Sequence, residues 1–171
     1  MKVLTLVDGS EHSLKALDFS ISLLGQNSTN SIQYKDRVQS NHQLIILNIL
    51  QPLKLSEEVV QQFNSIDSER KNILRKYLKD INSAMKDSWI KKFSYLKLKY
   101  EKTGIQIITK IIEGTHSSVI AYNIIKFADD QKVDMITIGG VGIGGFHEKK
   151  SLRSVTRNVS EISTRPVLIV H

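Results

Sequence analysis

Short apolar runs alternate with amphipathic segments along the chain. Five runs rich in Val, Ile and Leu predict β-strands at residues 2–7, 44–50, 106–112, 134–138 and 167–170. Apolar residues at helical spacing predict helices at residues 11–24, 56–103, 117–128 and 154–163. This strict alternation is typical of an α/β fold, and we expect a three-layer α/β/α architecture with an open five-stranded parallel sheet.

Two segments depart from the alternation. Residues 26–42 are polar, rich in Asn, Ser and Gln, and have no period, so we expect a mobile surface loop after a helix that stops at Gly25. One straight helix over residues 56–103 would be about 70 Å long, which exceeds the width of a compact domain of this size. We therefore expect a break or a projecting arm there, within one domain that spans residues 1–171.

Composition excludes several classes of protein. The chain has 171 residues, 40% of them hydrophobic, which is enough for one sizeable core. It has no cysteine, which excludes a disulfide framework, a thiolate zinc site and a cysteine nucleophile. The apolar run at residues 1–7 is shorter than a signal peptide needs, and no stretch approaches the length of a membrane span. We expect a soluble cytoplasmic protein with no membrane partner.

The net charge of +7 is concentrated in one segment. Residues 69–102 contain eleven Lys and Arg against four Asp and Glu, so this stretch carries the whole excess and the rest of the chain is neutral. A basic face of this kind can bind nucleic acid or another anionic surface. The alternative, which we favour, is a solvated helix face, because charge runs usually have that role.

Three loops follow predicted strand ends, at residues 8–10, 50–53 and from 139 onward. Ligands of parallel sheets bind at the carboxyl ends of strands, where the strand order reverses. The loop at residues 139–145 holds five of the nine glycines and leads toward a helix that begins near Ser154. Glycine amides and a helix N-terminus both favour an anion, so we interpret this loop as a phosphate site, with a ligand-free flexible connection as the alternative.

Asp8 is the candidate functional carboxylate at the end of the first strand. It can accept hydrogen bonds from a ribose or help to hold a metal, or it can serve the turn before the helix, where Ser10 is the more natural N-cap. The sequence has no P-loop, HExxH or GxSxG motif and no convincing catalytic triad. A literal GxGxxG at residues 140–145 follows the fourth strand and is no dinucleotide fingerprint. We expect no dedicated enzyme.

At these positions the chain resembles the universal stress protein family. Similarity extends over most of the chain. It is carried by the first strand with its Asp-x-Ser turn (residues 3–11), the second strand (45–49), the Gly turn after the third strand (113–116), the fourth strand (134–139) and the closing segment (154–159 and 165–170). The resemblance implies a Rossmann-like fold of the adenine-nucleotide α-hydrolase type. It also implies a regulatory or stress-response role with at most weak ATP hydrolysis.

The ATP-binding branch of this family carries the motif G-x2-G-x9-G-[ST]. Gly139 and Gly142 match its first half. The second half is altered, because the loop is one residue longer and Arg153 stands where the motif has glycine. The arginine either fills the phosphate pocket or grips a phosphate, and we favour retained binding.

The resemblance implies an adenine-nucleotide site for ATP or AMP, with Mg²⁺ as an optional companion. Asp8 would contact the ribose, and Ile49 would meet adenine through its backbone. Gly139 and Gly142 would line the ribose and phosphates, and Ser154, Val155 and Thr156 would offer backbone or hydroxyl groups to phosphate. Arg153, where the chain departs from the motif, is the further candidate for a phosphate contact. The resemblance further implies a homodimer joined through the last strand. Three alternatives stay open: a family member that binds no nucleotide and acts through protein partners, a nucleic-acid-binding module that uses the basic stretch, and a related nucleotidyl-transfer enzyme, whose loop signatures are missing after the first strand.

Overall fold

The computed structural model describes residues 1–29, 42–64, 68–114, 117–140 and 152–171. It contains one sheet of five parallel strands in the order β3-β2-β1-β4-β5. The strands are β1 (Lys2–Leu6), β2 (Gln43–Leu50), β3 (Gln106–Glu113), β4 (Met135–Gly139) and β5 (Val167–Val170). The predicted α/β fold with an open parallel sheet is confirmed.

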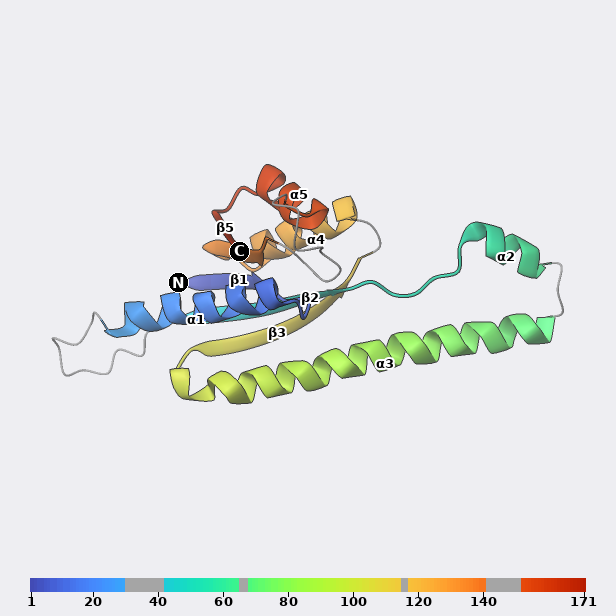
Figure 1. The fold of residues 1–171 in the computed structure, drawn as a ribbon, viewed down its shortest axis with the longest axis horizontal. Helices are drawn as coiled ribbons and strands as arrows, with labels where there is room; N and C mark the ends of the chain where they lie inside the picture. Colours follow the sequence, from blue (N-terminus) through green and yellow to red (C-terminus); the bar gives the residue numbers. More distant parts are fainter. Residues whose placement is uncertain (30–41, 65–67, 115–116, 141–151) are drawn as a thin grey trace.

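Helices cover both faces of this sheet (Figure 1). They are α1 (Glu11–Thr29), α2 (Glu57–Asn64), α3 (Ser68–Tyr100) with a 3₁₀ turn η1 (Glu101–Thr103), α4 (Ser117–Asp130) and α5 (Ser154–Ile162). Helices α1 and α3 lie on one face, and α4 and α5 lie on the other. None of the helices in the described part of the chain is long and apolar enough to cross a membrane.

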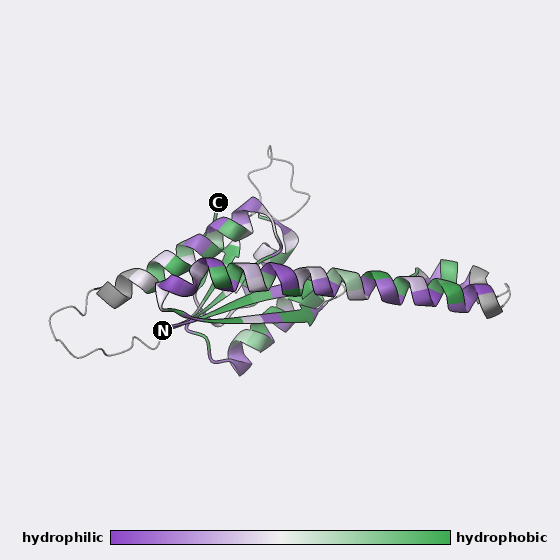
Figure 2. Cartoon of the chain, turned by 90° about the horizontal axis from the view of Figure 1, so that it is seen from below, coloured by the Kyte–Doolittle hydropathy of each residue, from purple (hydrophilic) through white to green (hydrophobic). Residues whose placement is uncertain are grey.

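The central strands are apolar throughout because each of their faces meets a layer of helices. In β1, Leu4 and Leu6 pack toward α4, whereas Val3 packs toward α1 and α3. Strand β2 alternates in the same way, and Leu44 to Leu47 are fully buried. Figure 2 shows that the strands are coloured as predominantly apolar.

The first helix departs from its predicted extent. It continues through Gly25 to Thr29, because a Gly in a helix costs only about 1 kcal/mol relative to Ala, and the buried Leu24 anchors that turn. Leu14, which the helical spacing predicts to face the core, is 40% exposed. The remainder of the predicted polar loop, residues 30–41, lies outside the described residues.

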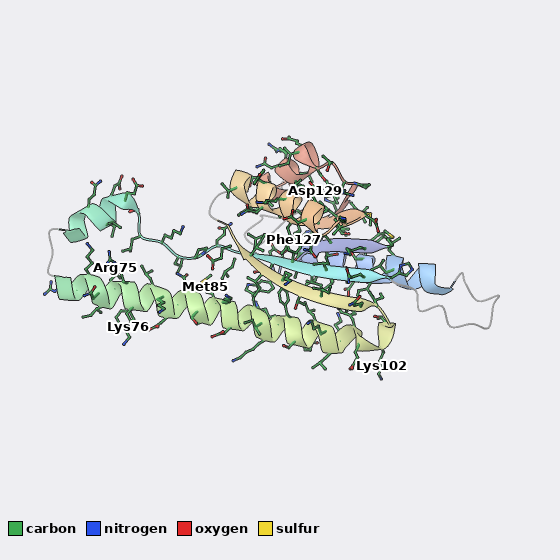
Figure 3. The ribbon with its side chains drawn as sticks, turned by 180° about the vertical axis from the view of Figure 1, so that it is seen from behind. Arg75, Lys76, Met85, Lys102, Phe127 and Asp129 are labelled. Atoms are coloured by element: carbon green, nitrogen blue, oxygen red, sulfur yellow. The ribbon has the colours of Figure 1, made fainter. Side chains whose placement is uncertain are left out.

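The long helical segment forms a projecting arm. Helix α3 has 33 residues and is therefore about 50 Å long. Its C-terminal half packs on the sheet, where Phe93 and Leu96 are buried, and its N-terminal half extends beyond the sheet beside α2 (Figures 1 and 2). Arg75 points toward α2, whereas Lys76 points away from it (Figure 3). The segment therefore shows both the interruption and the arm expected from its length.

Hydrogen bonds attach α3 to its neighbours at two points. Near the arm, the Asn82 side chain accepts from the Leu53 N–H at 2.8 Å and donates to the Leu53 carbonyl at 3.1 Å. At the other end, the Tyr100 hydroxyl donates to Asp18 on α1, and Lys99 lies 3.6 Å from the same carboxylate. These contacts hold α3 to the segment that follows β2 and to α1.

Candidate functional site

A cleft of about 300 Å³ opens at the carboxyl ends of β1, β2 and β4. Here the strand order reverses, since the chain leaves β1 toward α1 on one face and leaves β4 toward α5 on the other. The cleft is lined by β1 and the turn after it, the first turn of α1, the end of β2, the end of β4, α4 and the start of α5: Leu6, Val7, Asp8, Ser10, Ser13, Leu47, Ile49, Gln51, Ile120, Ile124, Ile138, Gly139, Arg153, Ser154, Val155 and Thr156.

The structure brings together seven of the eight residues that the sequence indicated. They come from four separate segments and all line this cleft: Asp8, Ile49, Gly139, Arg153, Ser154, Val155 and Thr156. The eighth, Gly142, lies outside the described residues, as does most of the glycine-rich loop. The sequence analysis did not name Ser13, Gln51 or the α4 residues of the cleft; Gln51 follows a strand end that it did flag.

Asp8 and Ser10 form a compact turn at the end of β1. The Asp8 Oδ1 atom accepts from the Ser10 N–H at 2.9 Å and from the Ser10 hydroxyl at 2.6 Å. The Ser10 hydroxyl oxygen in turn accepts from the Ser13 N–H at 3.2 Å, so Ser10 is the N-cap of α1 as predicted. Gly9 adopts a φ of 88°, which favours glycine. The turn holds the half-buried Asp8 carboxylate at the rim of the cleft.

Strand β2 runs past β1 and presents main-chain groups to the cleft. Pairing with β1 ends at Leu47, whereas pairing with β3 continues to Leu50. The Leu47 carbonyl accepts from the Val7 N–H at 2.9 Å, so Leu47 directs its main-chain groups toward β1. Directions alternate along a strand, so Ile49 directs its N–H and C=O to the same side, where β1 has ended. A flat heterocycle placed there can pair with this main chain.

A buried Asn fixes the geometry of that strand end. The Asn48 side chain donates to the Val7 carbonyl at 2.9 Å and is 2% exposed. It thereby joins the ends of β1 and β2 just before Asp8 and Ile49.

Helix α5 points its uncapped N-terminus at the cleft. Arg153 is the N-cap, is in an extended conformation and makes no side-chain capping hydrogen bond. The N–H groups of the first helical turn, from Ser154, Val155 and Thr156, have no partner within the helix. Together with the helix dipole they favour an anion, and the Arg153 guanidinium adds a positive charge to the same part of the cleft.

Gly139 and Thr156 connect β4, α5 and α1 at the base of the cleft. The buried Thr156 hydroxyl donates to the Gly139 carbonyl at 2.9 Å, so its proton is engaged within the protein. A Cβ on Gly139 would lie 2.8 Å from the His12 carbonyl carbon and 2.9 Å from the Ser13 nitrogen. Gly139 therefore also allows α1 to pack closely against β4, a role that the sequence analysis did not foresee.

The charged residues and the apolar residues of the cleft lie on different helices, strands and loops. Among the described residues that line the cleft, Asp8 and Arg153 are the charged ones, and each lies beside or near a serine at the end of a loop. The β2 and α4 side is apolar, from Leu47, Ile49 and Ile120. In the described part of the chain no three His, Cys, Asp or Glu side chains gather as metal ligands. The cleft suits a ligand with an apolar flat end and an anionic end.

A Rossmann-like α/β protein with a cleft at its switch point is the class that this fold and site define. The chain matches the Universal stress protein family over residues 1–171, and it belongs to that family. It is 28% identical over 169 residues to "Universal stress protein YxiE" of Bacillus subtilis (strain 168), covering 99% of this chain and 97% of that protein.

Solved structures have the same fold. Universal stress protein UspA from Lactobacillus plantarum matches with a TM-score of 0.66 and 14% identity, covering 100% of this chain and 97% of that one. A family protein from Arabidopsis thaliana with AMP bound matches at 0.56 and 12%, covering 99% and 90%. A universal stress protein in complex with cAMP matches at 0.51 and 23%, covering 100% and 96%.

Proposed function

We propose that this protein binds an adenine nucleotide in the β1–β4 cleft and acts as a regulatory or stress-response protein. The observation that carries the proposal is the convergence of Asp8, the Ile49 main chain, Gly139 and the α5 N-terminus on one cleft at the switch point. Family members of the same fold bind AMP and cAMP, which supports an adenine nucleotide as the ligand.

The two ends of the cleft correspond to the two ends of a nucleotide. The base lies on the apolar side beside Leu47 and Ile120, and its edge pairs with the Ile49 main chain. The ribose hydroxyls donate to the Asp8 carboxylate, because a charged acceptor is the stronger partner for a hydroxyl. The phosphate lies at the α5 N-terminus, where the Ser154 N–H group and its neighbours are free of helical partners.

Arg153 supplies a positively charged side chain at the phosphate end of the cleft. Because the Arg153 side chain makes no capping hydrogen bond, its guanidinium can grip a phosphate with paired charge-assisted bonds. AMP places one phosphate there, and ATP brings two more. Mg²⁺ would enter with ATP through the phosphates, since Asp8 is the one carboxylate among the described residues that line the cleft.

Calorimetric titration of AMP and ATP into the wild type and Arg153→Gly tests the proposal. The wild type should bind both nucleotides, and the variant should bind them about tenfold or more weakly, the effect of losing a charge-assisted contact. Tighter binding by the variant means that the arginine obstructs the site and overturns the phosphate clamp. Absence of binding by both proteins refutes the nucleotide site and favours a family member that acts through protein partners.

We also propose a cytoplasmic homodimer that pairs through β5. This strand is an edge of the sheet, and all four of its residues are half-buried rather than exposed. An apolar edge favours pairing with a second copy, and a two-fold pair is the commonest closed assembly. Light scattering should give twice the chain mass for the wild type. A monomer for the wild type at tens of micromolar counts against this interface.

A further inference from the structure

The opposite edge of the sheet carries a groove that the nucleotide site and the β5 edge do not use. Strand β3 ends the sheet, pairs with β2 over eight residues, and has no described strand on its other side. Helix α3 runs beneath it on one face, in the layer that Figure 1 shows below the sheet. An edge strand of this length directs alternate N–H and C=O groups away from the sheet.

The groove between α3 and β3 has a volume of about 340 Å³. Its walls come from one helix and one strand: Lys86, Ile90, Phe93, Ser94, Lys97, Thr109, Lys110 and Ile111. Ile90 is 50% exposed although it is a large apolar residue, and the Phe93 ring below it is buried. An apolar floor with a polar rim is typical of a surface that a partner covers.

The rim of the groove is basic. Lys86 and Lys97 of α3 line it, and no acid does among the described residues. Lys110 of β3 borders the groove through the strand edge, but its side chain alternates with that of Ile111 and so lies on the other face of the sheet. All three lysine side chains are exposed, and within the described ranges no carboxylate is close enough to form an ion pair with any of them. Lys86 and Lys97 belong to the basic stretch at residues 69–102. In this groove their positive charges lie beside the open edge of β3.

We propose that the groove binds an extended acidic segment of a partner protein, which adds to the sheet as a strand beside β3. Its main chain would pair with the β3 edge, and alternate side chains would point down toward α3. Lys86 and Lys97 are eleven residues apart, about 16 Å along the helix axis. Side chains on one face of a strand repeat every 6.6 Å or so. Acidic residues at positions i, i+2 and i+4 of the segment therefore reach both lysines.

A second copy of the chain and a nucleic acid fit the groove less well than an acidic peptide. A second copy of β3 would bring its own Lys110 and the same basic helix to the groove, and like charges across an interface are destabilising. A nucleic acid would satisfy the lysines but would leave the main-chain groups of the β3 edge and the apolar side chains of Ile90 and Ile111 without matching partners. The acidic extended peptide uses the lysines, the edge and the floor together.

Fluorescence anisotropy with designed peptides tests this proposal on the full chain. The probe is a labelled, end-blocked octapeptide with Glu at alternate positions and Thr and Val between them. One control peptide has Gln in place of each Glu, and a second keeps each Glu but has N-methylated amides at alternate residues, which blocks pairing with an edge. A labelled single-stranded oligothymidylate of equal charge represents nucleic acid.

Charge-reversal variants locate the site. The test variant is Lys86→Glu with Lys97→Glu, and the matched control is Lys76→Glu with Lys102→Glu, which makes the same change in net charge at exposed positions outside the groove. The Glu peptide should bind the wild type. The test variant should weaken binding by about tenfold or more, and the control by less than about threefold.

Each remaining outcome has a defined meaning. Loss of binding on changing Glu to Gln and on N-methylation supports the acidic strand. If the N-methylated peptide binds as tightly as the Glu peptide, main-chain pairing with the β3 edge does not contribute to binding. If both protein variants lose the same affinity, binding is due to general charge attraction. Either result overturns the proposal. Tighter binding of oligothymidylate with the same sensitivity to Lys86 and Lys97 replaces the peptide by nucleic acid. These results do not depend on the nucleotide cleft.

Discussion

Gly139→Ala should destabilise the protein because one methyl group has no space at the junction of β4 and α1. The added Cβ would lie 2.8 Å from the His12 carbonyl carbon, 2.9 Å from the Ser13 nitrogen and 3.0 Å from the His12 Cβ. Carbon atoms pack best at about 3.5–4.0 Å, so the first turn of α1 must move by half an ångström or more. Overpacking of this kind costs about 1–3 kcal/mol of unfolding free energy.

Urea and thermal unfolding measure this cost, and two other glycines provide matched controls. A loss of about 1–3 kcal/mol lowers Tm by roughly 2–12 °C in a chain of this length. Gly25→Ala makes the same change inside α1 with no atom within 4 Å of the new Cβ, and it should raise stability by about 0.5–1 kcal/mol. Gly104→Ala also meets open space, but φ is 71°, so it should cost about 1 kcal/mol by strain alone. Wild-type stability in Gly139→Ala would refute the packing argument.

Three further predictions concern hydrogen bonds. Asp8→Ala should lower the free energy of unfolding by about 1 kcal/mol, because it removes the acceptor of the turn, and it should also abolish the ribose contact. Asp8→Asn should restore most of the stability but not the nucleotide affinity. Urea unfolding measures the stability, and calorimetry measures the affinity. Asn82→Ala should release Leu53, leave Tm within about 3 °C, and raise amide hydrogen exchange in the arm alone; unchanged exchange there contradicts the clamp. Burial, and then the hydrogen bond to Asp18, raise the pKa of Tyr100, so the folded state holds this proton more tightly than the unfolded state. Its stabilisation is complete below about pH 10 and is lost as pH rises further, and unfolding series at increasing pH should show a smaller alkaline loss in Tyr100→Phe.

The sheet could be predicted from the sequence because its strands are apolar on both faces and separated by periodic segments. The nearly continuous apolar run from Leu44 to Leu50 predicted a strand buried on both faces, and β2 contains all of these residues. Helix ends were harder, since a stop signal such as Gly25 is weak beside the burial of Leu24. The order of the strands was not predicted, because pairing is a property of the folded chain and no local pattern encodes it.

The candidate site could be predicted in part for the same reason. Residues after strand ends converge in any parallel sheet, so Asp8, Gly139 and Ser154 could be named from the sequence. The direction of the Ile49 main chain depends on where β1 stops, which only the strand register shows. The packing role of Gly139 depends on an α1 contact from a distant part of the chain, and the basic groove depends on Thr109 and Ile111 of β3 lying beside α3. Such long-range contacts leave no local signal.

Two-dimensional amide NMR during titration with AMP tests the central claim most directly. If the nucleotide lies in the β1–β4 cleft, the amide signals of Asp8, Ile49, Gly139 and Ser154 should shift together and saturate with one affinity, while signals from the α3 arm stay in place. The first-turn N–H groups of α5 should shift most, because they meet the phosphate directly. Saturating shifts confined to other parts of the chain, or no shifts at all, would contradict the account.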